Sequence, residues 1–149
     1  RDNLLAHIQR MKKEATLITT ATIADNDEYI VAPHAFEIRS IHQLDKEIFG
    51  PVLHVIRFRA DELHAVADAI NSTGYGLTFG IHSRIDDTIE FFASRIQAGN
   101  IYINRSMIGA TVGMQPFGGE GLSGTGPKAG GPHYLTRFVT ERTISTNTA

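Results

Sequence analysis

A glycine-rich stretch at residues 108–131 constrains the fold of this chain more than any other feature. It contains too many glycines for a regular helix or strand, and it far exceeds the roughly 4 to 6 residues of a typical loop. Loops of this length are usually functional or disordered. Apolar side chains recur along it, as they do not in a solvated linker, at Ile108, Val112, Met114, Phe117 and Leu122. We therefore expect an ordered loop.

Two interpretations of this loop follow from its residues. Glycine permits positive φ angles and lets a backbone approach a ligand closely, and successive amides in such conformations form concavities that attract anions. The loop would then hold a carboxylate or phosphate, with Phe117 as an apolar wall. Alternatively, the glycines serve only the turns of a tightly folded loop. The residues alone leave both interpretations open.

Composition places the chain among ordinary globular proteins and excludes several function classes. Its 149 residues suffice for a single domain with a core, and 42% are hydrophobic. The net charge of −2 and the lack of a Lys/Arg cluster do not support nucleic acid binding. The absence of cysteine removes disulfides, thiolate metal sites and a cysteine nucleophile from this segment. Because the chain begins without methionine, we expect it to start partway through a longer protein.

The first half of the sequence predicts a helix and two strands. Leu4, Ile8 and Met11 have helical spacing, with basic residues closing the segment as the helix dipole favours. Residues 29–39 predict a broken or edge strand, because Pro33 removes a ladder donor. A short linking segment at residues 40–49 follows it. The nearly continuous apolar run at residues 52–58 predicts a strand covered on both faces.

The second half alternates helices and short strands up to the glycine-rich loop. Asp61 is expected to cap a helix with an apolar face formed by Leu63, Val66, Ala67 and Ile70. A strand at residues 79–82, a helix opened by Asp86 and a strand at residues 101–103 come next. This alternation predicts an α/β fold with parallel βαβ units, in which ligands lie beyond the carboxyl ends of the strands. The loop leaves from that edge.

After the loop, residues 133–138 predict one or two helical turns. The polar, β-branched tail predicts a terminal strand that adds to an exposed sheet edge of this subunit or another. The pattern GxGxxG at residues 119–124 lacks the strand and helix of a dinucleotide site, so it is discounted. The seven histidines have no metal-ligand spacing, and no metal site is predicted.

Two motifs together resemble those of the aldehyde dehydrogenase superfamily. They are Glu-x-Phe-Gly-Pro at residues 47–51 and Pro-Phe-Gly-Gly at residues 116–119, and segments 71–77 and 98–104 fit the same order. The loop with Thr125 is similar to that of glutamate-semialdehyde (pyrroline-5-carboxylate) dehydrogenases. The tail looks most like that of the bifunctional proline utilization A flavoenzymes. The resemblance implies a partial catalytic domain over residues 1–139, its C-terminal part, and an oligomerisation strand over residues 140–149.

This resemblance implies a role for five residues. Glu47 would accept hydrogen bonds from the nicotinamide ribose of NAD, and Phe49 would pack beside that ribose and ring. Gly109 and Ala110 would donate amide hydrogen bonds to the substrate carboxylate, and Phe117 would pack on its aliphatic part. A carboxylate suits a diol because it is an acceptor-only group. Without the resemblance, Glu47 would be a solvated linker charge and Phe49 a core residue.

The implied activity is the NAD-dependent oxidation of L-glutamate 5-semialdehyde to L-glutamate in proline catabolism. Family members use a cysteine nucleophile, pass hydride to NAD⁺ and release the acid with the help of a glutamate. This chain lacks that cysteine, so it is expected to be inactive alone. The alternatives are a dehydrogenase for another aldehyde, which would lack the Gly-Ala anchor, and a non-catalytic carboxylate-binding module.

The resemblance also implies partners and a location. The chain would require the missing upstream part of the same protein and would form a homo-oligomer. FAD would bind only in a proline dehydrogenase domain outside this chain, where one is present. A cytoplasmic enzyme is expected, with peripheral attachment to the inner membrane only through other domains.

Overall fold

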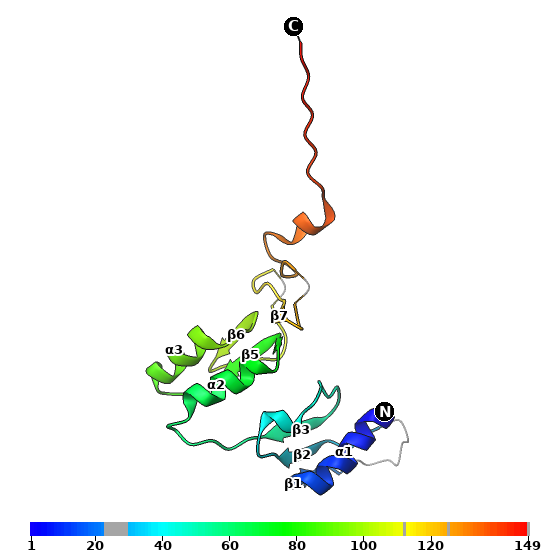
Figure 1. Ribbon diagram of the computed structural model, residues 1–149, viewed down its shortest axis with the longest axis vertical. Coiled ribbons are helices and arrows are strands. Elements are labelled where there is room, and N and C mark those ends of the chain that lie inside the picture. The colour runs from blue at the N-terminus through cyan, green and yellow to red at the C-terminus, as the bar shows by residue number, and fades with distance from the viewer. Residues whose placement is uncertain (23–29, 112, 125, 149) are drawn as a thin grey trace. The chain divides into compact units, whose positions relative to one another are not determined.

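The computed structural model describes residues 1–22, 30–111, 113–124 and 126–148 (Figure 1). The chain divides into two compact units, Arg1–Ala69 and Ile70–Ala149, which are described separately. Three residues of the predicted strand and loop, Tyr29, Val112 and Thr125, lie outside the described residues.

The first unit begins with the predicted amphipathic helix, α1 (Asp2–Glu14). Ile8 and Met11, which repeat at helical spacing, are both buried, so the predicted apolar face is confirmed. Asp2 lies in the first turn and Lys12 and Lys13 lie in the last, which complements the helix dipole.

Three strands accompany α1, as Figure 1 shows: β1 (Thr16–Thr20), β2 (His34–Glu37) and β3 (Val52–Val55). Their order is β1-β2-β3, with β1 and β2 antiparallel and β2 and β3 parallel. β1 was not predicted from the sequence. All of its residues are exposed, and its sequence has no alternation of apolar and polar side chains that would indicate a strand.

The prediction of a broken or edge strand at residues 29–39 is wrong in one respect. β2 is the central strand of the sheet, and both Ala35 and Phe36 are buried. Pro33 precedes the strand, and its carbonyl accepts a hydrogen bond from the Ala21 amide. Because the proline stands outside β2, it removes no donor from the ladder.

The linking segment and β3 also differ in detail from their prediction. Residues 40–49 include a 3₁₀ helix, η1 (Ile41–Gln43), which is stabilised by a capping box between Ser40 and Gln43. β3 ends at Val55, which is shorter than the predicted strand. Leu53 on β3 is 61% exposed, so the two faces of this strand are not both covered in this chain.

The core of the first unit lies between α1 and the sheet. Its buried members come from the helix and from β2 and its extension: Ile8, Met11, Phe36 and Ile38. Partly buried side chains surround them, including Leu4, Leu44, Val52 and Ile56. Phe36 is fully buried and is among the largest side chains of this cluster.

Helix α2 (Leu63–Ser72) presents the predicted face: Ala67 is buried, and Leu63, Val66 and Ile70 are half-buried. The prediction that Asp61 caps this helix is wrong. Its carboxylate oxygens accept hydrogen bonds from the Arg59 guanidinium at 2.9 and 3.1 Å. The bidentate pair with arginine engages both oxygens of the group expected to cap the helix.

The second unit contains the strands β5 (Thr78–Ile81) and β6 (Asn100–Ile103), joined through α3 (Asp86–Arg95) (Figure 1). These elements lie where the sequence predicted a strand, a helix and a strand. β5 and β6 are parallel. Among the described residues, β3 pairs only with β2 and β5 only with β6, so no single sheet joins the three predicted strands.

The C-terminal part of the second unit has little regular structure. Helix η2 (Tyr134–Phe138) provides the predicted helical turns. Residues 140–148 are exposed and form no strand in this chain. Addition of this tail to a sheet edge of another subunit stays a prediction.

Candidate functional site

The glycine-rich loop is folded onto the strands of the second unit. β7 (Glu120–Gly121) within the loop pairs with β4 (Tyr75–Gly76) in antiparallel fashion. Phe117 and Ala129 form a second bridge, with N–H to carbonyl distances of 3.0 and 2.9 Å in the two directions. These pairings support an ordered loop rather than a solvated linker.

Gly109 and Ala110 lie at the start of this loop. Gly109 has a φ angle of 72°, in the left-handed region that favours glycine. In the part of the chain that the structure describes, the amides of Gly109 and Ala110 have no hydrogen-bond partner. Two consecutive unpaired amides provide donors that an anionic group can use.

The residues that follow make a compact turn around the carbonyl of Thr111. That carbonyl accepts hydrogen bonds from the amides of Met114 and Gln115, at 3.1 and 2.9 Å. The Gln115 side-chain oxygen accepts in turn from the Thr111 amide at 2.9 Å. These hydrogen bonds involve Thr111, Met114 and Gln115, and none of them uses the amides of Gly109 and Ala110.

Phe117 is half-buried, and its backbone is paired with Ala129 on one side. The carboxamide of Asn100 binds the two neighbouring residues, Pro116 and Gly118. Asn100 was not identified from the sequence. Its signals were its place in segment 98–104, which fits the order of the family motifs, and a polar side chain at the first position of the strand that leads into the loop.

Glu47 and Phe49 lie in the first unit, between η1 and β3. The Glu47 side chain is exposed and has no partner among the described residues, and Phe49 is 84% exposed. Gly50 follows with a φ angle of 153°, and a Cβ there would meet the Leu4 side chain at 2.5 Å. Glycine thus suits this position by its φ angle, and a larger residue would also require the Leu4 side chain to move.

The structure thus brings the three substrate candidates into one loop of the second unit. The two cofactor candidates share one segment of the first unit. Phe49 is exposed in this chain, so the alternative interpretation of Phe49 as a core residue is wrong.

A histidine pair is the most unusual electrostatic feature of the first unit. The Nε2 atoms of His7 on α1 and His54 on β3 are 2.9 Å apart, so one ring donates a hydrogen bond to the other. Burial lowers the pKa of both imidazoles, and a positive charge on His7 lowers the pKa of His54 further. The sequence did not indicate this pair, because the two histidines are 47 residues apart and share no motif spacing.

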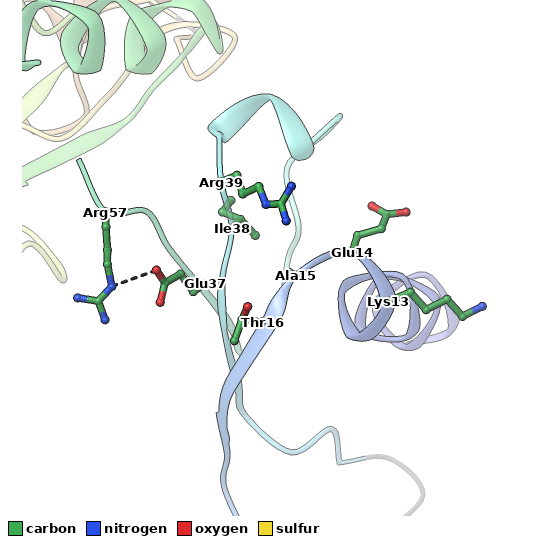
Figure 2. Close-up of a pocket in the computed structure, with 8 residues that line it drawn as sticks. All are labelled: Lys13, Glu14, Ala15, Thr16, Glu37, Ile38, Arg39 and Arg57. Carbon is green, nitrogen blue, oxygen red and sulfur yellow. Dashed lines mark hydrogen bonds and ion pairs between the residues drawn. The ribbon is translucent and has the colours of Figure 1, made fainter. Parts of the chain in front are cut away.

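A cavity of about 530 Å³ lies at the end of the sheet in the first unit (Figure 2). Its charged lining residues are Lys13, Glu14, Glu37, Arg39 and Arg57. Figure 2 shows the ion pair between Arg57 Nε and Glu37 Oε1, at 3.0 Å. None of the five candidate residues lines this cavity.

A second cavity of about 490 Å³ lies beside the base of the loop. β6 lines it together with Gln115, Pro116 and Lys128. The Tyr102 hydroxyl is buried and has no hydrogen-bond partner among the described residues. The ammonium group of Lys128 donates to the Gly99 carbonyl and so ties the far end of the loop to β6.

Two features are absent from the residues that the structure describes. They contain no group of three or more histidine or carboxylate side chains placed to hold a metal ion. Among the same residues, no helix combines the length and the apolar character needed to span a bilayer.

The curated relatives of this chain include proteins named PutA and 1-pyrroline-5-carboxylate dehydrogenase. It is 54% identical to the bifunctional protein PutA of Rhizobium meliloti over 142 residues, which cover 94% of this chain and 12% of that protein. It is 39% identical to the 1-pyrroline-5-carboxylate dehydrogenase of Bacillus pumilus, with 97% of this chain and 28% of that protein covered. The chain thus spans between about an eighth and a quarter of these relatives.

Solved structures agree with these similarities. A mutant of Bradyrhizobium japonicum proline utilization A matches with a TM-score of 0.90 and 61% identity, over 96% of this chain and 14% of that one. A Thermus 1-pyrroline-5-carboxylate dehydrogenase with bound NAD matches with a TM-score of 0.80 and 38% identity, over 91% of this chain and 26% of that one. The model of the aldehyde dehydrogenase family matches residues 1–144. On this evidence, the chain belongs to the aldehyde dehydrogenase family.

Proposed function

We propose that this chain is the C-terminal part of the catalytic domain of an NAD-dependent dehydrogenase. This longer protein, the parent enzyme, oxidises L-glutamate 5-semialdehyde to L-glutamate. The names of the relatives support a role in proline catabolism. The observation that carries the substrate assignment is the pair of amides at Gly109 and Ala110, which have no hydrogen-bond partner among the residues that the structure describes.

The substrate has a carboxylate and an amino group at the end opposite its aldehyde. The Gly109 and Ala110 amides donate to that carboxylate, and Phe117 packs against the methylene groups between the two ends. Binding at the far end of the substrate orients its reactive carbon, so the binding energy also serves to position the aldehyde for reaction. A left-handed Gly109 is required, because a shift of its backbone would rotate the neighbouring amide away.

The residues of the first unit fit the cofactor. Glu47 offers an exposed carboxylate, which accepts hydrogen bonds from a ribose diol. Phe49 offers an exposed aromatic ring, which packs against a planar or sugar ring. The cofactor supplies the hydride acceptor when it is bound.

Catalysis requires groups outside this chain. The nucleophilic cysteine comes from the upstream part of the parent enzyme, because this chain contains none. Alone, the chain is inactive. Where the parent enzyme carries a proline dehydrogenase domain, FAD belongs to that domain.

Assembly involves the C-terminal tail. Ile144 in the tail is 79% exposed, and Leu135, Phe138 and Val139 before it are at least 68% exposed. Exposed apolar side chains in series are typical of a surface that another subunit covers. We infer that residues 140–149 add as a strand to a second subunit of a homo-oligomer.

The experiment measures NADH formation by the parent enzyme with glutamate semialdehyde and with pentanal, an uncharged aldehyde of similar length. The wild-type enzyme is expected to prefer the semialdehyde. Ala110→Leu places a bulky side chain at the carboxylate site and removes most of that preference. Ala65→Leu, at an exposed position of α2, is the matched control and leaves it intact.

Each alternative has its own outcome. Equal activity of the wild-type enzyme on both aldehydes would sink the substrate assignment and favour a dehydrogenase for another aldehyde. An isolated chain that folds as a monomer, binds glutamate and has no active parent would favour a carboxylate-binding module.

A further inference from the structure

We propose that Asn100 is a positioning residue of the substrate loop, holding the backbone on both sides of Phe117. This inference rests on the proposed function, in which Phe117 packs against the substrate. Asn100 acts through the loop that carries Phe117, because the hydrogen bonds of its side chain go to Pro116 and Gly118.

The two hydrogen bonds of the Asn100 side chain define its role. Its Nδ2 donates to the Pro116 carbonyl at 3.0 Å, and its Oδ1 accepts from the Gly118 amide at 3.2 Å. The backbone partners determine the orientation of the carboxamide, since a carbonyl only accepts and an amide N–H only donates. No carboxylate or hydrocarbon side chain of this length makes both bonds.

Neighbouring backbone groups fix the start of β6, on which Asn100 lies. The Asn100 amide donates to the Leu77 carbonyl at 3.1 Å, just before the parallel pairing of β5 and β6 begins. Gly99 before it packs so closely on Gly118 that a Cβ would collide with the Gly118 carbonyl. The carboxamide is therefore presented from a rigid element to the segment it holds.

Other contacts keep the loop folded when this clamp is lost. Phe117 retains its backbone pairing with Ala129, and β7 retains its pairing with β4. Loss of the Asn100 bonds therefore releases the Pro116 carbonyl and the Gly118 amide, on either side of Phe117, without detaching the loop. The expected consequence is a misplaced Phe117 ring rather than an unfolded domain.

The second unit offers a matched control in Asn71. Its Nδ2 donates to the Arg95 carbonyl and its Oδ1 accepts from the Gln97 amide, both at 2.9 Å. This clamp has the same chemistry but joins the end of α2 to the end of α3. Asn71 contacts no residue of the substrate loop through its side-chain hydrogen bonds.

The test compares Asn100→Asp and Asn71→Asp in the parent enzyme. Aspartate keeps the acceptor but turns an oxygen toward the Pro116 or Arg95 carbonyl, so each variant loses one donor at an equivalent clamp. Steady-state kinetics use glutamate semialdehyde, NAD⁺ and propanal, an aldehyde too short to reach from the catalytic centre to the far-end anchor. Asn100→Ala replaces the aspartate variant if the latter does not fold.

We expect Asn100→Asp to raise KM for the semialdehyde about 10-fold, the size of one lost hydrogen bond. KM for NAD⁺ and kcat/KM for propanal are expected to change less than 2-fold, and Asn71→Asp is expected to leave all three near wild type. A purely structural role would shift all three together in the Asn100 variants, and that result would overturn the inference. Unchanged KM for the semialdehyde would overturn it as well.

The wild-type enzyme separates this inference from the proposed function. A wild-type preference for the semialdehyde, combined with unaffected Asn100 variants, would remove only the positioning role. A wild-type enzyme without that preference would overturn the proposed function and the positioning role with it.

Discussion

Two glycines of the same loop allow a controlled test of the amide anchor. Gly109 and Gly130 both have a φ angle of 72°, and a Cβ built on either meets no atom within 4 Å. Gly109→Ala and Gly130→Ala therefore impose the same backbone strain without a steric clash. Only Gly109 carries an amide in the proposed carboxylate site.

The expected loss of stability comes from backbone strain, and the expected loss of kcat/KM comes from a lost hydrogen bond to the substrate. A non-glycine residue in the left-handed region costs about 1–2 kcal/mol, so both variants are expected to lose about 1 kcal/mol of stability. Relaxation of that strain rotates the amide next to residue 109. Loss of one hydrogen bond to a charged group costs about 1.5–3 kcal/mol, which corresponds to roughly 10- to 150-fold in kcat/KM.

The assay pairs thermal unfolding of the parent enzyme with NADH kinetics on glutamate semialdehyde. We expect the two variants to have similar melting temperatures, and only Gly109→Ala to lose kcat/KM by 10-fold or more. Equal kinetic losses would mean that strain in the loop, rather than an amide anchor, controls activity. A Gly109→Ala enzyme with wild-type kinetics would refute the anchor directly.

Three further predictions concern the first unit. Glu47→Ala is expected to raise KM for NAD⁺ about 10-fold or more while leaving KM for the aldehyde unchanged, and unchanged cofactor kinetics would remove its assignment. The pKa values of His7 and His54 are lower in the folded than in the unfolded chain, so the unfolded chain binds protons at a higher pH. The folding stability that these neutral histidines provide is therefore complete above pH 6.5 and decreases as the pH falls below 6.5. Thermal melts of His54→Gln should therefore depend less on pH between 5 and 7 than those of the wild type, and identical profiles would contradict this. Phe36→Ala should cost about 3–5 kcal/mol in denaturant unfolding, against about 0.5 kcal/mol for Leu53→Ala, because only Phe36 is fully buried.

The helices and the loop could be predicted because their signals are local. In α1 the apolar residues Ile8 and Met11 recur at the helical period, and the structure buries both. The same reasoning located α3 and the strands on either side of it. The glycine content of residues 108–131 identified a long loop, and the apolar side chains along it indicated that the loop is ordered.

The errors arose where a local rule competed with a contact to a distant or stronger partner. Pro33 indicated an edge strand, but the proline lies just outside β2 and its carbonyl bonds to Ala21. Asp61 had the character of a helix cap, but the Arg59 guanidinium binds both of its oxygens. A bidentate ion pair and a place in the centre of a sheet depend on tertiary arrangement, which residue preferences do not report.

The sequence by itself therefore determined the three α-helices, the strands that flank α3, the glycine-rich loop and the motifs of the family. Tertiary structure alone decided which side chains meet. His7 and His54 are 47 residues apart, and Asn100 is 18 residues from the Gly118 amide that it binds. Periodicity encodes which face of an element is apolar, but a hydrogen bond between distant residues forms only after packing has brought their backbones into register.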